Sequence, residues 1–191
     1  PLYLVDPRRS LYKREPKLKV YPVTVVNLLG KYGDFETDSD SDGCADGWEL
    51  YNTVNTYGTI STDKVVVGTK SQRIYRTDGI TAIIPRTSFD VVTAGNTYFV
   101  SLWIWTGKDI GGPTVFFMGT TSITDATLYG DRTLGRFNKH YGTGISEYNG
   151  KIHFQYIQSG TGELTELWID GVMCVNLTRM GVLPPPLKEY F

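Results

Sequence analysis

Short runs of alternating apolar and polar positions extend over most of this sequence. The clearest of them is NTYFVSLWIWTG, at 96–107. One side of this run carries Tyr98, Val100, Leu102 and Ile104, and the other side carries Phe99, Ser101, Trp103 and Trp105. Because successive side chains of a strand point to opposite faces, the alternation predicts a strand, and the first side is expected to face the core.

The rest of the middle of the chain has the same β-rich character. Similar runs occupy 64–77, 81–92, 113–123, 151–160 and 163–177. Turn-forming pairs separate them, including Asp78-Gly79, Gly95-Asn96 and Asn149-Gly150. No stretch has an apolar stripe that would support a helix of about three turns. Many short strands at this spacing predict an all-β fold, a jelly-roll β-sandwich.

The two ends of the chain differ from this middle. Residues 1–22 hold three internal prolines and many charged side chains, and residues 181–191 hold a run of three prolines. Both are expected to form extended arms beside a jelly-roll domain at 23–180. The arms either fray or dock on a neighbouring subunit. The apolar anchors for docking would be Leu2, Tyr3, Leu4, Leu11, Tyr12, Tyr190 and Phe191.

Composition and charge narrow the function classes. With 191 residues, of which 40% are apolar and 13% aromatic, the chain can bury one sizeable core, so one main domain is expected. The 19 Lys and Arg balance 20 Asp and Glu, which gives no support for nucleic acid or an anionic membrane as the main partner. No apolar run has the length of a membrane span or of a secretory signal, so export by that route is not expected. Cys44 and Cys174 are expected to be free thiols.

The segment TDSDSDGCADGWE, at 37–49, has the spacing of a calcium loop. Such a loop needs oxygen ligands at its first, third, fifth, ninth and twelfth positions, Gly at the sixth and a backbone carbonyl at the seventh. In that order, the residues are Asp38, Asp40, Asp42, Asp46, Glu49, Gly43 and Cys44. The flanking residues read as strand or turn, so calcium would order the loop and would not drive a helix-opening switch. Magnesium fits this loop less well than calcium because it prefers a smaller octahedral shell. The alternative to a metal site is an acidic loop without an ion.

Four motifs, in order, resemble the carbohydrate-binding modules of families four, nine and twenty-two, which share the galactose-binding-like jelly roll. They are NLLGKYGDFE, DGWELYN, TAGNTYFVSLWIW and LTELWIDGVMCVNLT, and the resemblance covers residues 25–178. The closing WIDGVMCVNLT looks most like the form of this domain found in bacteriophage virion proteins, on tails, fibres and capsid surfaces.

The resemblance implies a structural calcium that ties the first strand to the last. Its side-chain ligands would be Glu36 and Asp170, with a backbone carbonyl near Lys70 as a third ligand. Because Glu36 lies close to Asp38 in the sequence, this site and the calcium loop could be separate or could merge into one. For Asp170 the alternative is an ordinary Asp-Gly turn.

The resemblance also places a ligand cleft on the face of the central strand that carries Trp103 and Trp105. Aromatic faces stack on pyranose rings, and neighbouring polar side chains supply hydrogen bonds. His153 and Gln155, on another predicted strand, would line the same cleft as polar partners. Weaker candidates, in a Gly-rich loop, are Tyr141 and Tyr148. The alternative for the two tryptophans is core packing or cover by the N-terminal arm.

An enzyme is not expected. The chain has no phosphate-binding Gly motif and no Ser-elbow pattern, and neither of its two histidines, His140 and His153, stands beside a nucleophile. Carboxylates crowded into one loop suit a cation better than a glycosidase acid pair, which works across a cleft.

Two functions are left. The first is a non-enzymatic structural component of a phage virion, either a capsid decoration or a tail protein, built on a calcium-stabilised jelly roll. It would be made in the host cytoplasm and would assemble through its arms with other virion proteins or with copies of itself. The second is an extracellular carbohydrate-binding module that recognises a host-surface or cell-wall glycan. Arms at both ends and the lack of a signal peptide favour the first function.

Overall fold

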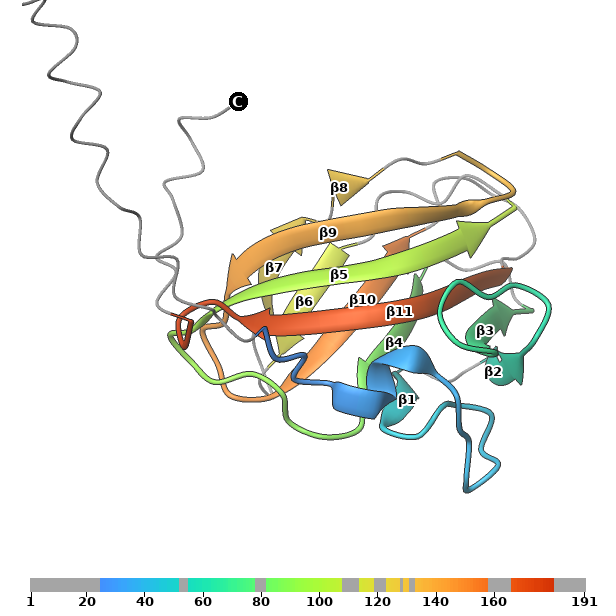
Figure 1. The fold of residues 1–191 in the computed structure, drawn as a ribbon, viewed down its shortest axis with the longest axis horizontal. Helices are drawn as coiled ribbons and strands as arrows, with labels where there is room; N and C mark the ends of the chain where they lie inside the picture. Colours follow the sequence, from blue (N-terminus) through green and yellow to red (C-terminus); the bar gives the residue numbers. More distant parts are fainter. Residues whose placement is uncertain are drawn as a thin grey trace, which may run out of the picture.

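The computed structural model describes residues 25–51, 55–77, 82–107, 114–118, 123–127, 129–130, 133–157 and 166–180. These residues form two antiparallel β-sheets (Figure 1). The five-stranded sheet has the order β1 (Trp48–Tyr51), β4 (Ala82–Thr87), β10 (Lys151–Ile157), β6 (Thr114–Met118) and β7 (Ile123–Thr127). The six-stranded sheet has the order β2 (Thr56–Ser61), β3 (Ser71–Arg76), β11 (Glu166–Asn176), β5 (Thr97–Thr106), β9 (Phe137–Ile145) and β8 (Tyr129–Gly130).

This architecture confirms the all-β sandwich expected from the alternation. Figure 1 shows β9, β5 and β11 in front, with β6, β10 and β4 behind them, so each sheet gives one face to a shared core. Within the described ranges the one helical element is the short 3-10 turn η2 (Gly30–Asp34), and no helix there is long and apolar enough to cross a membrane. The predicted arms, at 1–22 and 181–191, lie outside the described residues.

The core is built from the strand faces that the alternation indicates. The inward side of β5 is buried at Tyr98, Val100, Leu102 and Ile104. From the opposite sheet, Ile152 and Phe154 belong to the same apolar cluster. The Trp48 ring centre lies 5.1 Å from that of Phe35 and 5.8 Å from that of Phe154, which extends the core to the start of β1. Burial of this apolar surface is the main favourable contribution to folding.

Two stretches differ from the expected local structure. The run at 64–77 is predicted to be β-rich throughout, but its strand covers only Ser71–Arg76. Val66 and Val67 lie instead in a loop at 62–70, because their N–H groups donate to the side chain of Asp170. Tyr141, expected in a Gly-rich loop, lies in strand β9, where pairing along the length of β5 outweighs the low strand preference of the glycines beside it.

The N-terminal part of the domain attaches to β11 in the part that follows the register shift after Asp170. Asn27 Nδ2 donates to the carbonyl of Val172 at 3.2 Å, and Asn27 Oδ1 accepts the N–H of Cys174 at 2.9 Å. One side chain therefore satisfies backbone groups of β11 beyond its pairing with β3, which ends at Ile169. Gly33, in η2, lies against the same Val172 carbonyl, where a Cβ atom would clash.

The burial of β5 gives a direct test of this core. Leu102 is fully buried, whereas Leu134 is 47% exposed. We expect Leu102→Ala to lower the free energy of unfolding by about 2–5 kcal/mol, because it removes buried methyl groups and leaves a cavity. Leu134→Ala, the matched control, should change it by less than about 0.5 kcal/mol. Urea unfolding followed by tryptophan fluorescence measures both, and equal losses would contradict this core.

Candidate functional site

Three carboxylates come together in the loop between η2 and β1. One side-chain oxygen from each of Asp38, Asp40 and Asp42 lies within 4.8 Å of the others. The N–H of Gly43 donates to Asp38 Oδ2 at 3.2 Å, and the N–H of Cys44 donates to Asp42 Oδ1 at 2.7 Å. Asp38 Oδ1 is buried and has no hydrogen-bond partner among the described residues. Oxygen atoms this close together are compatible with a hard cation such as Ca²⁺.

This loop keeps its shape through close contact with the six-stranded sheet. Gly43 has φ +89°, and a Cβ atom there would lie 2.5 Å from the carbonyl oxygen of Gly58 in β2. Gln72 of β3 donates from Nε2 to the carbonyl of Gly43 at 3.0 Å and accepts the N–H of Ala45 at 2.7 Å. The glycine at the sixth position of the calcium-loop pattern is therefore required both by its left-handed backbone and by the approach of β2.

The structure places the other side-chain ligands of that pattern outside the aspartate group. Asp46 accepts hydrogen bonds from the Ser39 N–H, the Ser39 hydroxyl and the Thr37 hydroxyl, each at 2.8 Å, and the Ser39 N–H contributes most to lowering the pKa of Asp46. Glu49 lies in β1, where strand alternation directs its carboxylate to the outer face of the five-stranded sheet. The carbonyl of Cys44 as a ligand stays a prediction.

Asp170 is a fully buried carboxylate at the bulge of β11. Its Oδ2 accepts the N–H groups of Val66 and Val67 at 2.6 and 2.8 Å, and its Oδ1 accepts the N–H of Gly171 at 2.7 Å. Burial raises the pKa of Asp170, while the three backbone hydrogen bonds act in the opposite direction. The side chain thus anchors the loop at 62–70, which goes beyond what an ordinary Asp-Gly turn does.

Glu36 holds the end of the same loop. Its carboxylate accepts the Thr69 hydroxyl at 2.6 Å, the Thr69 N–H at 2.7 Å and the Lys70 N–H at 3.1 Å. The Thr69 hydroxyl contributes most to lowering the pKa of Glu36. Glu36 and Asp170 therefore both bind the loop at 62–70, with protein N–H groups as their partners. A calcium ion held by the two residues stays a prediction.

Trp103 and Trp105 lie on the outer face of the six-stranded sheet, where the loop at 62–70 also lies. Trp105 meets Trp168 of β11 edge-on, with ring centres 4.8 Å apart. The ammonium group of Lys64 lies 4.2 Å from the Trp105 ring centre and 3.8 Å from that of Trp168. Both rings are thereby engaged by a cation of the protein itself, at distances typical of cation–π contacts.

His153 and Gln155 lie on the outer face of the other sheet. They belong to β10, where they alternate with core residues, whereas the tryptophans belong to β5. The prediction that these two residues share one cleft with Trp103 and Trp105 is wrong, because β10 and β5 are in different sheets and their outward side chains point away from each other.

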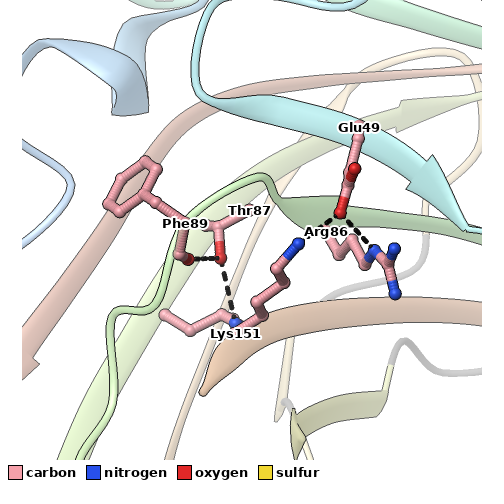
Figure 2. A network of polar contacts seen from close by, with 6 residues as sticks. Glu49, Arg86, Thr87, Phe89 and Lys151 are labelled. Atoms are coloured by element: carbon pink, nitrogen blue, oxygen red, sulfur yellow. Dashed lines mark hydrogen bonds and ion pairs between the residues drawn. The ribbon is translucent and has the colours of Figure 1, made fainter. Parts of the chain in front are cut away.

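A polar cluster with one exposed aromatic ring covers part of β1, β4 and β10. We call it the β10 face, and it consists of Glu49, Tyr51, Arg86, Lys151, His153 and Gln155. Strand register explains the cluster, since Glu49 is opposite Arg86 and Arg86 is opposite His153. Figure 2 shows Glu49 Oε1 accepting hydrogen bonds from Arg86 Nε and Lys151 Nζ, both at 2.6 Å. One carboxylate oxygen therefore links three strands.

Tyr51 is the aromatic part of the β10 face, and it is 42% exposed. The His153 ring meets it edge-on at 5.8 Å between ring centres, and the guanidinium carbon of Arg86 lies 4.7 Å from its ring centre. A further hydrogen bond joins β4 to β10, since the Thr87 hydroxyl accepts the N–H of Ile152 at 3.2 Å (Figure 2). An exposed ring held beside hydrogen-bonding groups is suited to a polar, ring-shaped ligand.

The electrostatics of the β10 face favour binding over catalysis. Burial lowers the pKa of His153 to about 4, and the charges of Arg86 and Lys151 act in the same direction. Burial raises the pKa of Glu49, but the hydrogen bond from Lys151 and the charge of Arg86 outweigh it, so the net shift is downward. At neutral pH the face holds an ion-paired carboxylate and an uncharged imidazole, which form no acid and base pair poised for proton transfer.

Sequence reasoning singled out His153 and Gln155 of this face but missed Lys151, Tyr51 and Arg86. Alternation in WELY, at 48–51, places Tyr51 on the same side of its strand as Glu49, so that signal was available. The position of Arg86 beside Glu49 depends on the pairing of β1 with β4, which no local pattern specifies.

Comparisons with known proteins support the fold. No protein-family model matches the chain, and a search of curated proteins found no match. The solved CBM22-1 xylan-binding domain of Paenibacillus barcinonensis Xyn10C matches with a TM-score of 0.58 and 14% identity, over 82% of this chain and 97% of that one. The arabinose-bound α-L-arabinofuranosidase MgGH51 matches with a TM-score of 0.61 and 10% identity over 81% of this chain, and bacteriophage CBA120 tailspike protein 4 with 0.53 and 12% over 79%.

These matches differ in how much of the other protein they cover. This chain spans only 26% of the arabinofuranosidase chain and 21% of the tailspike chain, but nearly all of the xylan-binding domain. At such low identity the similarity establishes a β-sandwich of the carbohydrate-binding-module type and does not extend to the ligand.

The uncharged His153 makes stability depend on pH. Its pKa falls from 6.5 to about 4 on folding. Between these values the unfolded chain binds more protons, so the free energy of unfolding should decrease as pH falls from about 6.5 to about 4, by up to roughly 3 kcal/mol. We expect His153→Gln to remove this part of the decrease. Urea titrations of both proteins across this range measure the difference, and a difference that does not vary with pH would contradict the assignment.

Proposed function

We propose that this chain is a non-catalytic carbohydrate-binding module that binds a glycan across its β10 face. The observation that carries the proposal is Tyr51, a residue that is 42% exposed and whose ring contacts His153 and Arg86. A pyranose can stack on the open part of this ring while Arg86 and Lys151 donate hydrogen bonds to its hydroxyl groups. Gln155, on the same side of β10, adds an amide donor and acceptor.

The match to an entire binding domain supports this function better than it supports a structural role alone. The xylan-binding domain is covered over 97% of its length, whereas the matched enzyme and tailspike chains are covered over 26% and 21%. Polysaccharides of the xylan type are therefore the first glycans to test.

A second candidate is the virion role expected from the sequence, which the similarity to a phage tailspike favours. A glycan-binding domain carried on a phage particle would combine the two functions. The segments at 1–22 and 181–191 would then join it to other virion proteins or to copies of itself. In this combination Trp105 packs against Lys64 of the loop at 62–70, and the glycan binds at the β10 face.

For the acidic loop we propose a bound Ca²⁺. Asp38, Asp40 and Asp42 supply three oxygen ligands, and the ion would offset the repulsion between their charges. The carbonyl of Cys44, which follows the sharp turn at Gly43, is the expected fourth ligand. The role of such an ion is rigidity of the connection that leads into β1.

Glycan binding should depend on Tyr51. On an array that includes xylan fragments, we expect the folded protein to bind at least one glycan, and Tyr51→Ala to weaken that binding about tenfold because the stacking surface is lost. Tyr141→Ala is the matched control, since that residue is 51% exposed but lies on β9 in the other sheet. Trp103→Ala should likewise leave the affinity unchanged. An array without hits, or an equal loss in the control, would count against the β10 face.

Calcium should stabilise the fold through the three aspartates. At a free Ca²⁺ concentration about 100 times Kd, the free energy of unfolding should rise by about 2.7 kcal/mol. The double variant Asp40→Asn with Asp42→Asn should lose this gain, while Asp63→Asn, an exposed aspartate outside the loop, should keep it. Thermal unfolding with added calcium and with chelator measures the effect. Identical melting temperatures for the unaltered protein would refute a tightly bound ion here.

A further inference from the structure

A pocket lies beside the acidic loop, at the edges of the two sheets. Its volume is about 400 Å³. The residues that line it include Asp42, Cys44, Glu49, Leu50, Tyr57 and Tyr75. β1 is the outermost described strand of the five-stranded sheet and β2 that of the six-stranded sheet, so the pocket lies where two open edges approach each other. Figure 1 shows β1, β2 and β3 together at this end of the molecule.

Tyr57 gives the pocket an aromatic wall. Its ring is stacked on that of Tyr75, with ring centres 5.4 Å apart and an angle of 23° between the planes. Tyr75 is held in turn by Arg73, 5.1 Å from its ring centre, and Arg73 is paired with Glu166 at 2.5 Å. Because Tyr57 is 47% exposed while one side of it is stacked, its other side is open to a ligand.

The charged groups of the pocket are carboxylates. Asp42 belongs to the aspartate group, so it lies in a strongly negative part of the surface. Glu49 is paired with both Arg86 and Lys151, so its charge is offset and Asp42 supplies the negative charge of the pocket. Cys44 adds no charge, because burial raises the pKa of its thiol to about 12. Carboxylate oxygens beside an aromatic face attract an organic cation, through charge-assisted hydrogen bonds and a cation–π contact.

We propose that this pocket binds a protonated amino sugar, with the sugar ring against Tyr57 and the ammonium group at Asp42. The volume is within the range of about 300–1,000 Å³ that is usual for small-molecule sites. A neutral or N-acetylated sugar has no positive charge for the carboxylates to meet, so the pocket selects the free amine. The inference goes beyond the proposed function, because the pocket is a second site whose aromatic wall is separate from Tyr51.

The test is a calorimetric titration with a fully deacetylated glucosamine trimer, in a buffer that contains chelator. We expect the unaltered protein to bind the trimer and to bind its N-acetylated counterpart at least about tenfold more weakly. Asp42→Asn and Tyr57→Ala should each weaken binding of the free amine by about tenfold or more. Asp63→Asn and Tyr141→Ala, which change exposed residues of the same two types elsewhere, should bind as the unaltered protein does.

Tyr51→Ala distinguishes this pocket from the β10 face. This variant should leave amine binding unchanged while it weakens glycan binding. The two measurements therefore test the pocket and the β10 face independently. Equal affinity for the N-acetylated trimer, or unchanged amine binding in Asp42→Asn, would overturn the pocket. Asp42→Asn changes only one exposed loop side chain, so it decides the question even if Tyr57→Ala does not fold.

Discussion

The buried carboxylate of Asp170 connects parts of the molecule that strand pairing alone leaves apart. β11 pairs with β5 on both sides of the register shift, and Asp170, in register opposite Trp103 just before the shift, binds the loop at 62–70. The burial of the carboxylate is tolerable because backbone N–H groups donate to both of its oxygens. The same loop carries Lys64 and receives Glu36 at its end. One buried group therefore links the last strand, the outer sheet face and the entry to the acidic loop.

The position of that loop determines which aromatic rings are left for a ligand. Lys64 lies over Trp105 and Trp168, so these rings stabilise the fold through contacts within the chain. On the opposite sheet Tyr51 is still 42% exposed, beside a carboxylate that two cations pair with. A tryptophan on an outward strand face is therefore weak evidence for a sugar site until the loops over that face are known, since its large surface also makes it a good partner for them.

The sequence could predict what depends on neighbours within a strand or a loop. The alternation at 96–107 specified both the strand and its core side, and the spacing of the calcium-loop pattern identified the three aspartates that come together. The sequence could not predict contacts between residues that are far apart along the chain. Val66 looks like a strand residue, but its N–H is bound by Asp170, 104 residues away. The pairing of β1 with β4, which brings Arg86 to Glu49, likewise has no local signal.

Charge is shared among the three candidate sites at this end of the sandwich. Asp42 belongs both to the aspartate group and to the pocket, and Glu49 belongs both to the pocket and to the β10 face. A cation at the aspartates would reduce the negative charge that Asp42 offers to an amine. Linkage requires that the amine weaken cation binding by the same factor. Neutral glycans on the β10 face would be bound by hydrogen bonds and by stacking on Tyr51. Their binding is therefore coupled to the other two sites only through Glu49.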